Sequence, residues 1–428
     1  MITNKYYQIA KKKLYPLCRS ITGNGVRNTL KIIKKEFPRL KILEVRSNQK
    51  VFDWKIPPEW NIKDAYVIDK NDKKIINFKK HNLHVVNYST RTKKVITKKM
   101  LLKKLHSLPK QPNAIPYVTS YYKKEWGFCI SQYQKNKISK QYTNKDKFKV
   151  FIDSNHNNKG SLTYGELIIK GKSEQEILIS TYICHPSMAN NELSGPIVSM
   201  ALINKFSKRK PKKTLRFLFI PETIGSIAYL SKNLHILKKN FIGGFNLSCI
   251  GDDRQHSCML SKYGNSNSDK ALLKAYKKLK LNFKRYSFLE RGSDERQYNS
   301  PGIDLGVSSI FRSKYNNFKE YHTSLDDFTL VTKNGVFGGY TVAKTAIEIL
   351  LDKTLPKNII LCEPQMGKRG LYPTLSKKGN FSKTRLLMSF LQYADGTNDL
   401  DKISKLIKCK YQDVLKIYKL FIKKKLII

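Results

Sequence analysis

The sequence has no long apolar run and no regular pattern of cysteines. No uninterrupted apolar stretch approaches the ~18 residues that a bilayer span requires, and the N-terminal stretch MITNKYYQIAKKKLYPLC lacks the apolar centre of a signal peptide. The seven cysteines are odd in number and irregularly spaced, which excludes a disulfide framework and a CxxC zinc knuckle. We therefore expect a cytoplasmic protein with no membrane partner.

Acidic residues are also scarce. The chain of 428 residues has 82 Lys and Arg against 32 Asp and Glu, a formal net charge of +50. Such a charge would ordinarily indicate a nucleic acid partner, but the lysines are spread along the chain and accompany many Asn, Ile and Tyr residues, as AT-rich codons favour. We interpret runs such as 11–13 and 423–425 as solvated faces, and we do not expect nucleic acid binding.

The apolar residues are arranged as in a large α/β protein with additions. Residues 24–37 have helical spacing, whereas 51–99 hold short β-branched segments separated by Asn, Asp and Lys turns. From about Phe148 onward, strand patterns (KVFIDS, GELIIKG, EILISTYIC, TLRFLFIP, FIGGFNLSCIG, IDLGVSSIF) alternate with helical segments near 193–207, 224–239, 268–280 and 334–351. This alternation predicts a parallel or mixed sheet covered by helices on both faces.

These patterns divide the chain into three parts. We predict an α/β domain over 1–355, with a small β-rich subdomain inserted at 50–110. Helical patterns at 383–394, 399–407 and 411–424 have the size of a winged-helix module, which we place at 380–428.

A histidine follows one of the predicted central strands. His185 comes after the apolar run 177–183, Pro186 stops the strand, and a helix begins near Leu193 with Asn190 or Asn191 available as its cap. A lone histidine is more often structural than a ligand, so His185 alone does not establish a metal site.

Three further segments carry chemistry after predicted strands or within loops. Glu222 ends LRFLFIP and could act as a general base or simply complement a helix N-terminus. RGSDERQY gathers carboxylates and a cation; the alternative interpretation is an ordinary solvated loop. His322 precedes two aspartates, and the alternative there is an ordinary surface loop. The candidate residues from these two loops are Asp294, Glu295, Arg296, Tyr298 and His322.

Together the four loops supply two histidines and several carboxylates at one predicted sheet edge. A catalytic zinc takes three N or O ligands and keeps one position open, and hydrolysis needs a carboxylate near that position. The set is sufficient for a zinc hydrolase.

The order of these motifs resembles a known family. The stretches NNELSG, PETIGS, SDERQY and YHTSLDD are similar to the co-catalytic zinc aminopeptidases of the bacterial leucyl aminopeptidase type. The resemblance is closer to aminopeptidase-like proteins with an inserted β-subdomain and a C-terminal winged helix, often encoded near surface-polysaccharide genes, and it includes DWKIPPEWNIKDAY, AIPYVTSYY and WGFCIS. It implies a phosphorylase/hydrolase-like mixed sheet, the zinc exopeptidase fold.

The resemblance also implies roles. His185 and His322 match zinc ligands, Glu222 matches the acid that deprotonates water, and Asp294 matches an acid that lines the substrate pocket. Three carboxylates of the two-zinc enzymes are replaced here, by Asn191, Thr223 and Ser248. We therefore expect one zinc ion in preference to two.

The sequence does not identify the third zinc ligand. Glu192 is our first candidate, because it is charged and seven residues from His185, although it could equally serve as a helix N-terminal acid; Asp252 or Asp253 could replace it. In the expected mechanism Glu222 takes a proton from zinc-bound water and returns it to the leaving amine. Asp294, Glu295 or Tyr298 would hold a substrate amine or hydroxyl, and Arg296 a carboxylate or phosphate.

The leading hypothesis is a zinc-dependent amide hydrolase acting on a small peptide or an acylated amino sugar, with homo-oligomer formation left open. The first alternative is an inactive aminopeptidase-fold protein that binds or scaffolds, suggested by the lost ligands. The second is a winged-helix DNA-binding regulator; it is weakened because the last helical segment has no arginine to read guanine edges.

Overall fold

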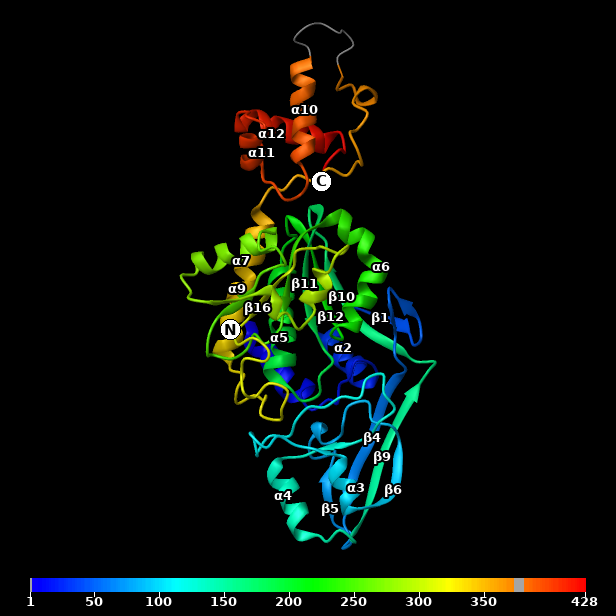
Figure 1. Ribbon diagram of the computed structural model, residues 1–428. Helices are drawn as coiled ribbons and strands as arrows, with labels where there is room; N and C mark the ends of the chain where they lie inside the picture. Colours follow the sequence, from blue (N-terminus) through cyan, green and yellow to red (C-terminus); the bar gives the residue numbers. More distant parts are fainter. Residues whose placement is uncertain (1, 373–380) are drawn as a thin grey trace.

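The computed structural model describes residues 2–372 and 381–428. Figure 1 shows three parts in a row: a small β-rich unit at one end, a large α/β body in the middle, and a helical module at the other end. The fold class predicted from the sequence is present in this arrangement.

The α/β body is built on an eight-stranded mixed sheet. Its strand order is β1-β10-β12-β11-β13-β16-β14-β15, and the central strand β11 runs parallel to both of its neighbours. The strands span Lys41–Arg46 (β1), Ser161–Ile169 (β10), Lys213–Ile220 (β12), Ser173–Tyr182 (β11), Phe241–Leu247 (β13), Ser308–Phe311 (β16), Ser257–Met259 (β14) and Lys284–Tyr286 (β15). The parallel arrangement of β12, β11, β13 and β16 brings the carboxyl ends of these four strands to one edge.

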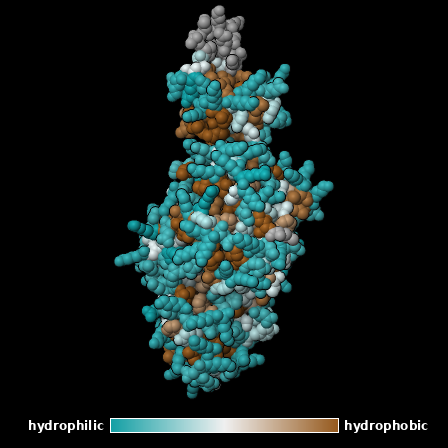
Figure 2. Space-filling view, turned by 180° about the vertical axis from the view of Figure 1, so that it is seen from behind, coloured by the Kyte–Doolittle hydropathy of each residue, from teal (hydrophilic) through white to brown (hydrophobic). Residues whose placement is uncertain are grey.

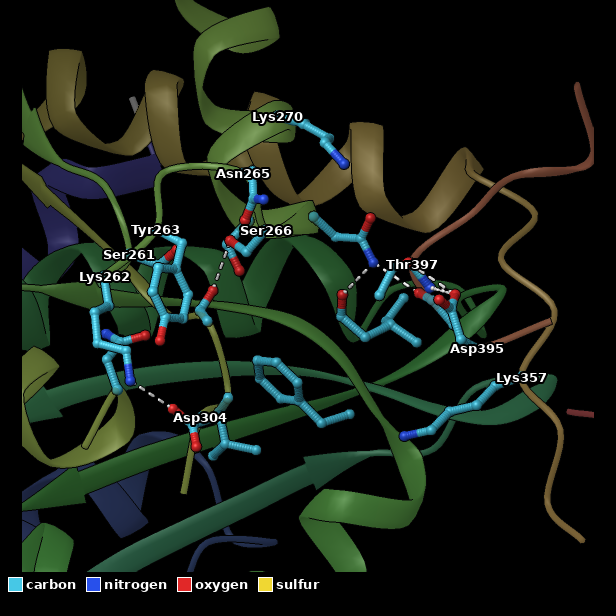
Figure 3. Close-up of a pocket in the computed structure, with 18 of the residues that line it drawn as sticks. Ser261, Lys262, Tyr263, Asn265, Ser266, Lys270, Asp304, Lys357, Asp395 and Thr397 are labelled. Atoms are coloured by element: carbon cyan, nitrogen blue, oxygen red, sulfur yellow. Dashed lines mark hydrogen bonds and ion pairs between the residues drawn. The ribbon is translucent and has the colours of Figure 1, made fainter. Parts of the chain in front are cut away.

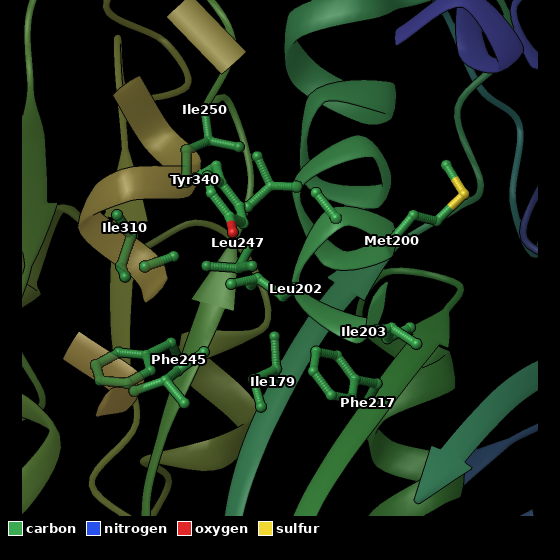
Figure 4. Packing of buried hydrophobic residues seen from close by; sticks show 14 of the residues in the cluster. Ile179, Met200, Leu202, Ile203, Phe217, Phe245, Leu247, Ile250, Ile310 and Tyr340 are labelled. Carbon is green, nitrogen blue, oxygen red and sulfur yellow. The ribbon is translucent and has the colours of Figure 1, made fainter. Parts of the chain in front are cut away.

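Successive residues of the central strands face opposite hydrophobic cores. Ile177 and Ile179 belong to a core shared with helices α5 (Ser194–Phe206), α7 (Asn267–Lys278) and α9 (Lys333–Asp352). Leu178 faces a second core shared with α6 (Ile224–Asn240), and Figure 4 shows the packing between α5 and the strands. Burial of each such side chain contributes about 1.5–3 kcal/mol, so helices on both faces hold the sheet.

The inserted unit has its own sheet, and this sheet reaches further along the chain than the sequence suggested. Its strand order is β5-β4-β9-β6, with β5 at Lys74–Asn77, β4 at Glu59–Ile68, β9 at Lys147–Asn157 and β6 at Thr92–Thr97. The assignment of KVFIDS to the main sheet is wrong, because β9 pairs with β4 and β6. Its alternation of buried and exposed residues is that of a strand with one solvated face, unlike the fully buried β12.

The C-terminal module consists of three helices around a separate core. Helices α10 (Phe381–Tyr393), α11 (Leu400–Leu406) and α12 (Tyr411–Lys423) agree with the predicted segments, and Phe390, Ile403 and Phe421 lie in their shared core. Bridges from residues 357 and 358 to 395 and 427 attach it to the segment that follows α9. Figure 2 shows hydrophobic side chains gathered on this module, above a mostly hydrophilic surface.

The remaining elements are short or peripheral. They are α1 (Ile2–Ile9), the π-helix η1 (Ala10–Leu14), α2 (Asn24–Glu36), β2 (Lys50–Val51), β3 (Trp54–Lys55), η2 (Asn82–His84), α3 (Lys98–Lys103), β7 (Leu105–His106), β8 (Phe128–Cys129), α4 (Gln132–Gln141), the π-helix η3 (Ala189–Leu193), η4 (Phe288–Glu290), α8 (Glu295–Tyr298) and η5 (Gly367–Arg369). Among the helices of residues 2–372 and 381–428, none combines the length and apolarity that a membrane crossing needs.

Candidate functional site

His185 lies just beyond the carboxyl end of β11, as its position in the sequence predicts. Its ring is fixed by a 2.8 Å hydrogen bond between Nδ1 and Oε2 of Glu192. The other ring nitrogen, Nε2, faces Glu222, with 3.7 Å between Nε2 and Oε2. One side of the imidazole is therefore anchored and the other is directed at a second carboxylate.

Glu192 is held in place by a buried cation. Arg19 is fully buried, and its Nε lies 3.5 Å from Oε1 of Glu192 and donates a 2.9 Å hydrogen bond to the carbonyl of His185. Glu192 is 1 % exposed. Removal of two charges from water costs several kcal/mol per ion, so each of them needs its partner.

The π-helix η3 that carries Glu192 is capped from a distant loop. The sequence suggested Asn190 or Asn191 as the side-chain cap, but this expectation is wrong: their backbone N–H groups donate to the carboxylate of Asp326 at 2.6 and 2.9 Å. Burial raises the pKa of Asp326 to about 7 against the effect of these hydrogen bonds. Asp326 lies in the loop of His322, so this cap joins two of the predicted site segments.

The side chains of Asn190 and Asn191 form hydrogen bonds with other buried residues. Asn190 Nδ2 donates to Asp252 at 3.0 Å, and Asn191 Oδ1 accepts a 2.8 Å hydrogen bond from the hydroxyl of Tyr182. Asp252 also accepts from the backbone and side chain of Ser313. These polar groups form a buried structural network.

His322 approaches His185 from a loop with a strained backbone. Its φ is +54°, a conformation that few non-glycine residues adopt, and its ring centroid lies 5.2 Å from that of His185. Tyr117 contacts both rings, with centroid distances of 5.3 Å to His185 and 5.2 Å to His322, and its backbone N–H donates to the His322 carbonyl at 2.8 Å. Tyr117 belongs to the connector between the inserted unit and the body, so the insert helps to position His322.

The Nε2 atom of His322 is buried and, within the described part of the chain, has no hydrogen-bond partner. Burial, with a smaller effect of His185, lowers the pKa of His322 to about 2. The imidazole is therefore neutral at ordinary pH, which is the form that binds a metal.

Glu222 follows β12 and is the most accessible carboxylate of the group, with 22 % of its side chain exposed. Its backbone N–H donates to Sγ of Cys184. Burial raises the pKa of Glu222, while His185 and Arg296 act in the opposite direction. A carboxyl with a raised pKa is suited to accept and return a proton near neutral pH.

The turn after Glu222 is held by Asp294 and Arg296. Thr223 has φ +64°, its N–H donates to Asp294 Oδ1 at 2.8 Å, and its hydroxyl accepts from Arg296 at 2.5 Å. Asp294 is fully buried, and burial together with Glu222 raises its pKa to about 7. Asp294 therefore lies behind the turn that carries Glu222.

The other predicted substrate-binding residues are buried elsewhere. Glu295 accepts the backbone N–H groups of 292 and 293 and the hydroxyl of Tyr315. Tyr298 is fully buried, and its hydroxyl lies 2.8 Å from that of Ser180. Both side chains have protein partners, and neither lines the pocket beside Glu222.

The fit to a metal ion can be tested on the donor atoms. In residues 2–372 and 381–428, only Cys184, His185 and Glu192 form a cluster of His, Cys, Asp or Glu ligand atoms within 4.8 Å of one another. Burial raises the pKa of Cys184 to about 11, and Nδ1 of His185 already shares its proton with Glu192. The nitrogen atoms left as candidate ligands are Nε2 of His185 and the unpartnered Nε2 of His322, on rings whose centroids lie 5.2 Å apart, and the Glu222 carboxylate lies 3.7 Å from the former.

The other residues considered as metal ligands are bonded within the protein or carry no carboxylate. Asp252 is committed to Ser313 and Asn190, and Asp253 accepts a hydrogen bond from the hydroxyl of Thr332. Ser248 is buried and offers a hydroxyl in place of a carboxylate. None of these three side chains is therefore a free carboxylate in the described structure.

Two cavities differ in their relation to these residues. A pocket of about 300 Å³ opens beside Glu222 and His185. A larger one, of about 420 Å³, lies between the α/β body and the C-terminal module, where Figure 3 shows Lys262 paired with Asp304 and Asp395 close to Thr397. The larger cavity is remote from the histidines and is lined by residues that the sequence did not single out.

Sequence reasoning missed three residues of the site. Arg19 and Tyr117 lie far from the histidines in the chain and in segments without a metal motif, and Asp326 was noted only as a neighbour of His322. The unusual stretch AIPYVTSYY, which includes Tyr117, was the one available signal. A single buried arginine in YPLCRSITG gives no pattern at all.

Comparison with known proteins identifies families and a relative that match this chain. The family described as domain of unknown function (DUF4910) matches residues 7–353, and a winged helix-turn-helix family matches 354–428. A protein of Clostridium acetobutylicum, named as a polysaccharide biosynthesis protein with an aminopeptidase-like domain, is 43% identical over 394 residues, 91% of this chain and 88% of that protein.

Solved structures give the same result for the fold. A crystal structure from Clostridium acetobutylicum, described as that of a peptidase, is 39% identical with a TM-score of 0.79 and covers 100% of this chain and 96% of its own. The zinc aminopeptidase BSAP of Bacillus subtilis is 12% identical with a TM-score of 0.59, covering 82% of this chain and 94% of its own. The predicted aminopeptidase-like fold with a C-terminal winged helix is confirmed.

Proposed function

The chain belongs to the family described as domain of unknown function (DUF4910), and we propose that it is a zinc-dependent hydrolase of amide bonds. The observation that carries the proposal is the 3.7 Å approach of Glu222 to His185 Nε2 beside an open pocket, with the ring centroid of His322 5.2 Å from that of His185. Zinc aminopeptidases share the fold, and a 39% identical structure is described as a peptidase.

In this proposal the two imidazoles hold the ion, and Glu192 has a different role from the ligand role that the sequence suggested. A carboxylate on the far nitrogen of a ligating histidine fixes its tautomer and orientation, and Glu192 is bonded to Nδ1 of His185 in this way. Arg19 and the cap from Asp326 position Glu192 in turn.

When bound, zinc would polarise the amide carbonyl and acidify a water molecule. Glu222 takes the proton of the attacking water at its carboxylate and returns it to the nitrogen of the leaving amine. Burial raises the pKa of Glu222, which makes its carboxylate a better acceptor for that proton. Asp294 and Arg296 act as positioning residues, because they hold the Thr223 turn that aims Glu222.

The substrate is an amide on a small molecule, either a peptide or an acylated amino sugar. The polysaccharide biosynthesis name of the Clostridium acetobutylicum relative supports the sugar, while the fold of the zinc aminopeptidases supports the peptide. We propose a cytoplasmic enzyme that acts on such a molecule.

The test combines metal analysis with hydrolysis assays on the wild type, His185→Ala and Glu222→Gln, with His235→Ala as a matched control at an exposed histidine. We expect about one zinc per chain in the wild type, in Glu222→Gln and in the control, and none in His185→Ala. Glu222→Gln should lose about 10²–10⁴-fold in turnover. Turnover by the Glu222→Gln variant at the wild-type rate would refute the assigned base.

A second function is favoured by one observation, the replacement of three expected carboxylates by Asn191, Thr223 and Ser248. These residues would suit a protein that binds the same molecules without cleaving them. Wild-type protein that contains no zinc and cleaves no amide would support this binding role.

A further inference from the structure

The pocket beside Glu222 is walled mainly by apolar and aromatic side chains. Its lining residues come from five separate segments of the chain and are Ile21, Trp54, Tyr121, Tyr122, Cys184, His185, Glu222, Thr223 and Ile224. Trp54, Tyr121 and Tyr122 come from the inserted unit and its connector, so the insert supplies the wall that faces the candidate catalytic residues.

Two of these aromatic rings are unusually accessible. Trp54 is 40% exposed and Tyr122 is 56% exposed, and their ring centroids lie 6.1 Å apart in an edge-on arrangement. Aromatic side chains bury 150–250 Å² each when covered, so this pair leaves a large apolar surface open at the pocket.

Tyr122 is held at this place by its backbone and its hydroxyl. Its φ is +63°, which is rare for a bulky residue, and its hydroxyl donates to the carbonyl of Lys55 at 3.3 Å. Lys55 follows Trp54 in the hairpin of β2 and β3. Strained conformations of this kind persist where the surrounding structure imposes them, and they gather at binding sites.

The charges around the pocket do not suit a free amino group. Among the described lining residues, Glu222 is the one carboxylate, and it is the group that must exchange protons in the proposed reaction. Arg296, a cation, is bonded to the hydroxyl of Thr223 in the pocket wall. Asp294 is turned toward Thr223 N and Ser226 from behind the turn and is fully buried.

An ammonium group that enters such a pocket would lose water and could pair only with Glu222, the carboxylate that the proposed reaction needs as its base, and it would lie near a guanidinium. An unpaired charge in an apolar site is strongly unfavourable. A neutral acylated amine avoids this cost, and its acyl group or its attached ring can pack on Trp54 and Tyr122.

We propose that this pocket selects an amine that is already acylated and discriminates against a free amino terminus, with Trp54 and Tyr122 as the contact surface for the acyl group or the ring that bears it. This inference rests on the proposed amide hydrolysis only for the position of the scissile bond; the selectivity itself is a property of binding. An acetylated amino sugar and an N-acylated peptide present the same chemistry.

Binding can be measured without turnover. The probes are two matched pairs, N-acetyl-leucinamide with leucinamide and N-acetylglucosamine with glucosamine, titrated calorimetrically into the wild-type protein, Trp54→Ala and Tyr122→Ala. Tyr133→Ala is the control, because Tyr133 is an exposed aromatic on α4 that does not line the pocket.

We expect the acetylated member of at least one pair to bind about tenfold more tightly than its free amine. Trp54→Ala should weaken that binding about fivefold, and the control should leave it unchanged. The pair that shows the preference identifies the sugar or the peptide as the source of the acyl amine. Equal or tighter binding of both free amines, binding of none of the four probes, or unchanged binding in Trp54→Ala would overturn the inference.

The result is separable from that for the proposed function. Preferred binding of an acetylated probe by a protein that has no zinc and cleaves no amide would refute the hydrolase and leave the selectivity standing. Faster cleavage of a free-amine substrate than of its acetylated counterpart would support the hydrolase and refute the proposed selectivity.

Discussion

Nδ1 of His185 and Oε2 of Glu192 are joined by a buried hydrogen bond of 2.8 Å across seven residues of sequence. Because the bond occupies one ring nitrogen, it determines which nitrogen remains for chemistry. The same carboxylate has Arg19 on its other side. The orientation of the imidazole therefore depends on a pair of charges that solvent does not reach.

The first prediction concerns the charge of Glu192. Glu192→Gln keeps the shape of the side chain but leaves Arg19 without a counter-ion, so we expect the free energy of unfolding to fall by about 3–5 kcal/mol. Zinc affinity should fall by about 10–100-fold, because the ring of His185 loses its orienting acceptor. Urea unfolding and competition with a zinc chelator measure the two effects, and the interpretation fails if neither changes.

The second prediction uses Arg19 to separate charge from shape. Arg19→Met should destabilise the fold by a similar amount, since it leaves the Glu192 carboxylate buried alone. In the double variant no charge remains unpaired, so the combined loss should be smaller than the sum of the single losses by about 1–3 kcal/mol. Strict additivity would show that the two groups do not interact.

The third prediction concerns the cap from Asp326. Asp326→Ala removes the acceptor of the Asn190 and Asn191 N–H groups, and we expect a loss of about 1–2 kcal/mol in unfolding free energy. Asp327→Ala is the neighbouring control, because in the described structure the hydrogen bonds of the Asp327 side chain go to Thr329, within its own turn. A larger effect of the control would contradict the assigned cap.

The fourth prediction is a pH dependence that arises from Asp294. Burial and Glu222 raise its pKa in the folded protein to about 7, whereas an unfolded aspartate releases its proton near pH 4. Between these values the folded state holds the additional proton, so this group makes the wild type less stable as the pH rises from about 4 to about 7.

Asp294→Asn removes this pH-dependent contribution to stability and keeps the oxygen that accepts hydrogen bonds from Thr223 and Ser226. We expect its stability relative to the wild type to increase between pH 5 and pH 8, as measured by urea unfolding at both values. Asp53→Asn, at an exposed position, should show no such change. A relative stability that is constant or decreasing over this range would show that Asp294 does not retain its proton.

The fifth prediction concerns the support of His322. Tyr117→Ala removes the ring that contacts both histidines, so the His322 loop should exchange its amide hydrogens about tenfold faster in residues 318–326. Tyr117→Phe keeps the ring and loses only the 2.7 Å contact with the Tyr121 hydroxyl. Equal exchange in the two variants would show that the ring does not support the loop.

The sequence predicted the parts of the fold that depend on local pattern. Mostly apolar segments such as 177–183 became buried central strands. Helical periodicity placed α5, α6, α7, α9 and the three C-terminal helices close to their observed bounds. The placement of β9 could not be predicted in the same way, because its pairing with β4 joins residues nearly a hundred positions apart.

The residues of the candidate site also differ in whether local sequence patterns could predict them. His185 and Glu222 follow strands whose carboxyl ends meet at one edge, so their proximity could be predicted from the strand pattern. The partners that fix them could not: Arg19, Tyr117 and Asp326 act through buried contacts between distant segments, and no local periodicity records such contacts. Glu192 was selected for its charge and its distance in sequence, and only the bond to Nδ1 indicates an orienting role.

The connector of the inserted unit forms backbone hydrogen bonds with the loop of His322, from Tyr117 N to the His322 carbonyl and between residues 115 and 324 in both directions through backbone and hydroxyl groups. The inserted unit and the loop that carries His322 are therefore joined directly by hydrogen bonds. A deletion that shortened the inserted unit through that connector would remove these hydrogen bonds, so we expect it to displace the imidazole as well.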